Sequence, residues 1–207
     1  MLFTILHQLQ SKRLVLGILA ASGLVACGGG GSSSPSSPTT STHTTAAYSA
    51  VASYSITDCV KSNATGLIWE GKTASGLRAG TALFTHYDNI TVAQVAQNGS
   101  YVLATQAQLD AASNSVAYVK AVNIDTLCGF TDWRLPTSAE LKTLVQAKPT
   151  PTSTSIDSAW FPNTPAYLYW TASAYGDAKY AWLVDFFDGS VVVSGHRGTP
   201  SHVRLVR

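Results

Sequence analysis

The 207 residues carry thirteen Lys and Arg against eleven Asp and Glu, and 10% of them are aromatic. Two of the cations, Lys12 and Arg13, lie in an N-terminal segment that we expect to be removed, so the mature chain is neutral. A neutral chain has no general attraction for nucleic acid, and five Trp with many Tyr and Phe argue against disorder.

The N-terminus has the features of a secretion signal. Lys12 and Arg13 precede the uncharged run 14–26, which is too short to span a bilayer comfortably. Residues 24–27, Leu-Val-Ala-Cys, resemble a bacterial lipobox, in which the Cys becomes the lipidated first residue of the mature chain. We expect a lipoprotein signal at 1–26 and a lipid on Cys27; the alternative is an ordinary signal peptide with an incidental Cys.

Residues 27–47 are rich in Gly, Ser, Thr and Pro, which is typical of a flexible tether. The tether would hold one folded domain, residues 48–207, away from a membrane to which only the N-terminal lipid binds. Gly28, in place of Asp after Cys27, favours the outer membrane. We therefore expect an outer-membrane lipoprotein that faces the cell surface, with a periplasmic orientation left open.

The domain contains two cysteines, Cys59 and Cys128. In an oxidising envelope two such thiols pair as a disulfide, and this is the favoured interpretation. Two buried free thiols are the alternative. Two isolated Cys do not have the spacing of a zinc site.

The first half of the domain predicts one strand and one helix. Residues 67–69 are a short apolar strand after the turn at 63–66, and residues 71–106 give no element. Ala112, Val116, Val119 and Val122 recur at helical spacing and predict a helix over 110–123.

The motif DWRLPT (132–137) leads into a second helix, predicted over 137–147. Thr137 and Glu140 have the spacing of a capping box, and Pro136 keeps Leu135 out of helical geometry. We expect Trp133 to be buried between helix and sheet and Arg134 to bond loop carbonyls or an acid; a ligand-contact role for both is the alternative. The same structural interpretation is favoured for Trp69, Trp170 and Trp182.

The last third of the chain changes to a β pattern after a Pro-rich loop at 148–165. Residues 167–173, 179–195 and 202–207 read as strands, and Asp188 with Gly189 predicts a hairpin turn. Alternation puts Trp182, Val184 and Phe186 on one face. Two helices against a small antiparallel sheet, with extensive loops, make an α+β domain.

These segments resemble the Lcl C-terminal domain family, named for the Legionella collagen-like adhesin, over about 57–207. The resemblance lies in TGLIWE (65–70), YVKAVN (118–123), LCGFTDWRLPTSAEL (127–141), FP (161–162), YWTAS (169–173), AWLVDFFDG (181–189) and VRLVR (203–207). It implies a C-type-lectin-like scaffold close to formylglycine-generating enzymes, and a surface binding module. For the namesake it implies adhesion to sulfated glycosaminoglycans; the namesake's collagen-like repeat is absent here, and a neutral chain does not favour a polyanion.

Catalysis and metal binding are less favoured. Formylglycine-type oxidation needs a Cys pair late in the domain, and no Cys follows residue 128. His86, His196 and His202 have no triad-like sequence context, so we expect no enzyme and no cofactor. Calcium binding by Asp177, Asp185 and Asp188 is conceivable, but Asp188 is explained by the turn, and we expect no metal.

We expect a protein or glycan ligand at the cell surface to bind the C-terminal loops, where small, polar and aromatic residues gather. The predicted contacts are Tyr175, Gly176, Asp177, Lys179, Phe187, Ser194, His196, Arg197, Thr199, Ser201 and His202. Lys179, His196, Arg197 and His202 could form a basic cluster for a carboxylate or sulfate.

Three other interpretations of these loops stay open. They could be solvated hairpin loops. They could be the variable segments of a diversity-generating retroelement target, since 175–178 and 191–202 have a mixed composition without Glu, Gln or Met. The domain could also be a structural subunit of an envelope or pilus-like assembly.

Overall fold

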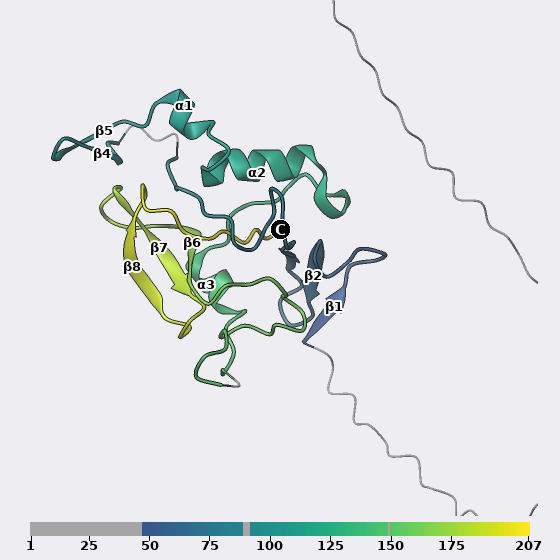
Figure 1. The fold of residues 1–207 in the computed structure, drawn as a ribbon. Coiled ribbons are helices and arrows are strands. Elements are labelled where there is room, and N and C mark those ends of the chain that lie inside the picture. The colour runs from purple at the N-terminus through teal and green to yellow at the C-terminus, as the bar shows by residue number, and fades with distance from the viewer. Residues whose placement is uncertain (1–46, 89–91, 149) are drawn as a thin grey trace, which may run out of the picture. The chain divides into compact units, whose positions relative to one another are not determined.

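The computed structural model describes residues 47–88, 92–148 and 150–207 (Figure 1). The predicted signal 1–26, Cys27 and the tether up to residue 46 lie outside the described residues. In chain order the elements are β1 (Tyr48–Ala50), β2 (Cys59–Ser62), β3 (Ile68–Glu70), β4 (Val95–Gln97), β5 (Ser100–Val102), α1 (Gln106–Leu109), α2 (Ser115–Ile124), the 3₁₀ helix η1 (Leu127–Gly129), α3 (Ser138–Lys142), β6 (Leu168–Ala174), β7 (Tyr180–Asp185) and β8 (Val191–His196). None of these helices has the length and apolar character needed to cross a membrane.

The strands form small antiparallel sheets, ordered β1-β2-β3, β4-β5 and β6-β7-β8 (Figure 1). Helix α3 packs against β6 and β7. The described part is therefore an α+β domain, as predicted. The predicted loop at 148–165 contains no helix or strand at its described positions.

The hairpin between β7 and β8 forms as the Asp-Gly pair predicts. Gly189 has φ 78°, in the left-handed region, and its N–H donates to the Asp185 carbonyl at 2.7 Å. The carboxylates of Asp185 and Asp188 accept the backbone N–H groups of Phe187 and Ser190. Local side-chain bonds of this kind fix a tight turn.

The core consists of two clusters joined by residues 203–207. One cluster contains the disulfide, Tyr118 and Trp170, and the other contains Trp69 and Phe161. The backbone N–H of Arg134 and that of Val206 each donate to the other's carbonyl at 2.9 Å. The strand predicted at 202–207 is thus a buried extended segment that makes isolated bridges, with the outer edge of β3 on one side and Arg134 on the other.

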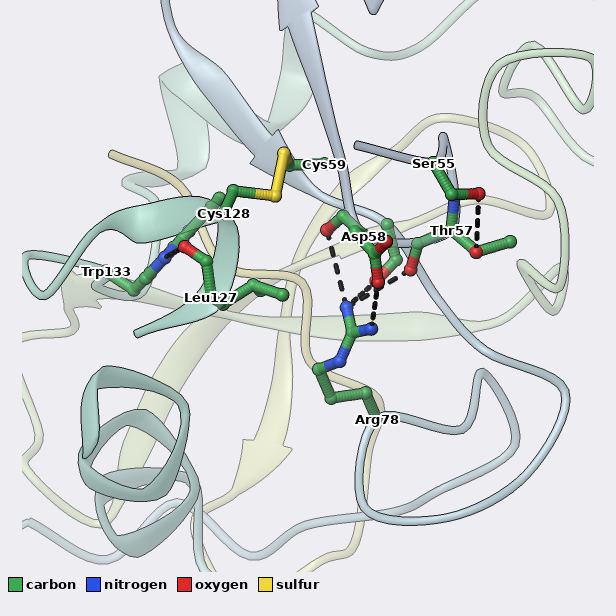
Figure 2. Close-up of a disulfide and its surroundings, with 9 residues drawn as sticks. Ser55, Thr57, Asp58, Cys59, Arg78, Leu127, Cys128 and Trp133 are labelled. Atoms are coloured by element: carbon green, nitrogen blue, oxygen red, sulfur yellow. Dashed lines mark hydrogen bonds and ion pairs between the residues drawn. A yellow bond between two sulfur atoms is a disulfide. The ribbon is translucent and has the colours of Figure 1, made fainter. Parts of the chain in front are cut away.

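Cys59 and Cys128 are joined in a disulfide, as predicted, which links β2 to η1 (Figure 2). Both cysteines are buried. Beside the bond, Arg78 donates to the Asp58 carboxylate at 2.7 Å and to nearby carbonyls (Figure 2). This ion pair holds the loop after β3 against the start of β2.

The helices are shorter than predicted. Residues 106–109 form a separate turn, α1, and α2 begins at Ser115 instead of residue 110. The Asn114 side chain explains the break, since it donates to the carbonyls of Tyr87 and Leu109 and so holds its backbone extended at φ −106°. Helix α3 has the predicted capping box at Thr137 but ends at residue 142, and the chain then turns so that Gln146 N–H bonds the Ser155 carbonyl.

The predicted structural roles of DWRLPT are confirmed. Trp133 is 2% exposed, and its indole N–H donates to the Leu127 carbonyl at 2.9 Å (Figure 2). Arg134 makes two bonds to the Glu140 carboxylate, at 2.9 and 2.7 Å. Trp69 and Trp170 are fully buried, but Trp182 is only partly buried, which corrects its assignment to the core.

Residues 71–106, for which no element was predicted, contain the hairpin β4-β5. Its turn is Asn98 and Gly99, both with positive φ (50° and 79°). Asn-Gly is the strongest short hairpin signal, so the sequence carried this information.

Candidate functional site

The predicted contact residues divide into an accessible group and a buried group. Tyr175, Gly176, Phe187 and Thr199 are exposed, and Asp177, Lys179 and His196 are partly buried. Ser194 lies within β8. The three remaining residues, Arg197, Ser201 and His202, are at most 6% exposed.

Arg197 belongs to the framework, which corrects its assignment as a ligand contact. Its guanidinium pairs with Asp88 at 3.0 Å and donates to the carbonyls of Ala178 and His86. Burial lowers the pKa of Arg197, and Asp88 opposes that shift. The side chain therefore ties the β6-β7 turn to the loop around residues 86–88 and has little capacity left for a ligand.

Ser201 and His202 are also framework residues, because the chain returns to the interior after the hairpin. Ser201 and Phe84 exchange backbone hydrogen bonds, at 2.8 and 3.0 Å. His202 Nδ1 lies 3.0 Å from the Ala82 carbonyl, and its ring centre is 5.1 Å from that of Tyr169. Burial lowers the pKa of His202, so its ring is neutral at neutral pH. The predicted basic cluster does not form.

Five rings instead lie together in what we call the aromatic patch: Tyr101, Tyr175, Tyr180, Trp182 and His196. The Tyr175 ring centre is 6.3 Å from Tyr180 and 5.6 Å from Trp182, both edge-to-face. His196 is 5.8 Å from Tyr180 and 5.1 Å from Tyr101. Tyr175 is 40% exposed and Tyr101 37%, while the other three are partly buried.

The β6-β7-β8 sheet and the β4-β5 hairpin together form the aromatic patch. Tyr180 and Trp182 come from β7, His196 is the last residue of β8, and Tyr175 directly follows β6. Tyr180 is paired with His196 in the sheet register, which sets their rings side by side. The patch is thus a ring surface on a rigid support.

An ion pair lies beside these rings. Lys179 Nζ is 2.8 Å from the Asp177 carboxylate and 4.9 Å from the Tyr101 ring centre. The hydrogen bond from Lys179 lowers the pKa of Asp177, and the same bond raises the pKa of Lys179. Burial, and then the charge of Lys179, lower the pKa of His196. At neutral pH the patch and the pair therefore carry no net charge.

Phe187 does not join this surface. It lies in the turn between β7 and β8, at the opposite end of β7 from Tyr180. Its ring is 52% exposed, with Lys148 Nζ 3.9 Å from the ring centre.

Tyr101 was missed by the sequence reasoning, and Tyr180 and Trp182 were treated as sheet residues without a contact role. Tyr101 could have been found from the Asn98-Gly99 turn, since it lies two residues beyond that turn in β5. No sequence signal places this hairpin next to His196.

His86, one of the histidines considered for catalysis, makes a buried contact within the fold. His86 Nδ1 lies 2.7 Å from Ser115 Oγ, and both residues are buried. Burial, with a smaller contribution from Arg197, lowers the pKa of His86 to about 3. In the described part of the chain, no three His, Cys, Asp or Glu side chains gather in a way that could hold a metal ion.

Searches of curated proteins and of solved structures returned no match. A family model, that of the Lcl C-terminal domain, matches residues 58–207. The matched range includes both cysteines, DWRLPT and every residue of the aromatic patch. The chain therefore belongs to the Lcl C-terminal domain family.

Proposed function

We propose that this protein is a surface-anchored lipoprotein whose domain binds a protein or glycan ligand through the aromatic patch. Membership of the Lcl C-terminal domain family supports an adhesin-like domain. The observation that carries the proposal is the group of five partly exposed rings around the Asp177–Lys179 pair.

The physical reason is that exposed aromatic groups are poor solvated surface but good contact surface. Tyr and Trp side chains have few rotatable bonds, so they bury a large area at a small loss of conformational entropy. The rings here pack on one another, which restricts them before a ligand arrives and favours affinity by pre-organisation.

The anchoring and the scaffold are part of the proposal. The lipobox at Cys27 and the tether would place the domain outside the outer membrane. The arrangement of short sheets, few helices and long ordered loops is compatible with a C-type-lectin-like scaffold. The role is binding and not catalysis.

If the domain is a retroelement target, burial limits which positions of the C-terminal loops can vary. Randomised codons are tolerable where side chains are exposed, as at Tyr175 and Thr199, and damaging at buried Arg197 and His202. Variation among genomes should therefore fall on the exposed positions of 175–178 and 191–202. If the domain is instead a structural subunit of an envelope assembly, a fixed partner should co-purify with the protein.

Glycan and host-protein arrays probed with the purified protein test the proposal, followed by affinity measurement with Tyr175→Ser and Tyr101→Ser. Each substitution removes an exposed ring and should weaken binding about tenfold or more. Phe187→Ser is the matched control, because it removes a ring that is even more exposed, at 52%, beyond the other end of β7. Affinity that falls with Phe187→Ser and not with the patch variants would overturn the proposal.

A further inference from the structure

A pocket that shares no residue with the aromatic patch lies between residues 73–81 and 158–165. The pocket has a volume of about 400 Å³, and its lining includes Thr73, Gly80, Thr81, Ser158, Phe161 and Thr164. The two loops are locked together, because Asn163 Nδ2 donates to the Lys72 carbonyl at 2.9 Å and a Cβ at Gly80 would overlap Asn163. The pocket is thus held open by fixed backbone.

A buried cation lies directly behind one wall. Arg204 is 0% exposed, and its Nη2 donates to Thr164 Oγ1 at 2.6 Å. Its Cζ is 5.0 Å from the centre of the Phe161 ring, and both Thr164 and Phe161 line the pocket. The guanidinium is therefore one side chain away from the pocket.

This cation makes no ion pair among the described residues, and the buried Glu70 carboxylate that acts on its charge also pairs with a second buried cation, Lys72. Arg204 Nη1 donates to the Glu70 backbone carbonyl, no carboxylate pairs with it, and its Nε has no hydrogen-bond partner in the described part. The Glu70 carboxylate lies 2.9 Å from Lys72 Nζ and accepts the Leu205 N–H at 3.0 Å, so the two buried cations share one carboxylate. Buried charges in proteins are normally paired.

Two residues with hydroxyl groups, Thr81 and Ser158, line the pocket, and one acid, Asp157, precedes Ser158 in the sequence. Asp157 accepts the Ala159 N–H and makes no ion pair with any described residue. Thr81 and Ser158 are exposed, and their hydroxyls make no hydrogen bond to the described residues. Thr81 and Ser158 thus line the pocket behind whose wall the buried Arg204 lies.

We propose that this pocket binds a small oxyanion: a carboxylate, phosphate or sulfate group. The Thr81 and Ser158 hydroxyls donate to it, and the field of Arg204, acting through Thr164 and Phe161, supplies the opposite charge. The site is independent of the aromatic patch and of whatever the patch binds.

The purified protein should be titrated with sodium sulfate, phosphate and acetate at constant ionic strength set with sodium chloride, and followed by backbone amide NMR shifts. Saturable shifts confined to residues 73–81 and 158–165 are expected, and the three salts distinguish the anion class. Shifts that chloride alone reproduces, or that appear only around Lys179, would refute the site.

Variants at Thr81 and Asp157 test the charge argument without touching the core. Thr81→Glu should bind the anion about tenfold or more weakly than Thr81→Gln, which loses the same hydroxyl and has the same size but carries no charge. Asp157→Asn keeps an oxygen that can accept the Ala159 N–H and removes the negative charge next to Ser158, so it should tighten binding several-fold. Equal affinity in Thr81→Glu and Thr81→Gln would show that charge does not govern the pocket and would sink the proposal.

Discussion

The disulfide between Cys59 and Cys128 gives the most quantitative prediction. It closes a long loop whose ends are 69 positions apart in the sequence, and it joins β2 to η1. Reducing it, or replacing both cysteines by Ala, frees the denatured chain and leaves the native contacts almost unchanged.

The size of the effect follows from the loop length. In the chain-entropy treatment a loop of this length contributes about 4 kcal/mol to the free energy of unfolding at room temperature. Domains of this size have a total of only about 5–15 kcal/mol. We therefore expect the bond to supply a large fraction of the stability, and its loss to lower the melting temperature by about 8–16 °C.

Urea unfolding followed by Trp fluorescence measures this loss, because the domain contains five Trp. Oxidised wild type, reduced wild type and the Cys59→Ala/Cys128→Ala protein should be compared. The single variant Cys59→Ala is the control; it breaks the same bond, so it should lose nearly as much as the double variant.

A loss below about 1 kcal/mol in both reduced wild type and the double variant would refute the reasoning. It would mean that the denatured chain is already restricted around these positions, or that the core cluster containing both cysteines holds without the link. A loss seen only in the Ala variants would instead indicate a packing defect at the buried sulfurs.

Three further predictions concern single side chains. The Arg134 hydrogen bond lowers the pKa of Glu140 from 4.5 to about 2, so the stabilisation from this pair is present above pH 4.5 and is lost as the pH falls towards 2. Arg134→Met should lower the free energy of unfolding by about 1 kcal/mol at neutral pH. In this variant the urea midpoint should fall less steeply between pH 4.5 and 2 than in wild type. Burial lowers the pKa of Lys72 from 10.5 to about 8, so stability should rise from pH 8 to 10.5 in wild type, and that rise should be absent from the profile of Lys72→Met. Gly195→Ala would place a Cβ 2.4–2.5 Å from buried side chains and should lower the free energy of unfolding by about 2 kcal/mol or more. Gly176→Ala is the control, because its Cβ would meet nothing within 4 Å, and it should change the free energy of unfolding by less than about 0.5 kcal/mol. Equal losses in the two variants would contradict the close packing at Gly195 in β8.

The features that the sequence predicted correctly are those that depend on near neighbours. The Thr137 capping box and the turn at Gly189 each form from residues within four positions. The disulfide was predictable for a different reason, since the domain offers only two cysteines. In all three cases few alternatives compete with the observed contact.

The errors arose where a side chain bonds a distant segment. Asn114 delays the start of α2 because it bonds the Tyr87 carbonyl, 27 positions away. Arg197 and His202 looked like loop residues, but their partners His86 and Ala82 lie more than a hundred positions earlier. Composition along one loop cannot reveal such partners.

The aromatic patch was likewise predictable only in its local parts. The rings at 175–182 were visible in the sequence, and so was the turn at Asn98 that carries Tyr101. Their meeting was not predictable, because it depends on how the β4-β5 hairpin is placed over the end of β8.

The position of residues 203–207 between the two core clusters has a consequence for the order of events during synthesis. Strand β3 bonds the Leu205 carbonyl through Glu70 and exchanges bonds with Arg207 through Ile68, so its outer edge is filled by a segment made more than 130 residues later. Until that segment has emerged, β3 presents an open edge beside exposed apolar side chains, which is a template for unwanted pairing with other chains. The domain should therefore acquire its native state late and all at once, and a nascent chain that pauses before residue 203 should need a chaperone to keep it from aggregating.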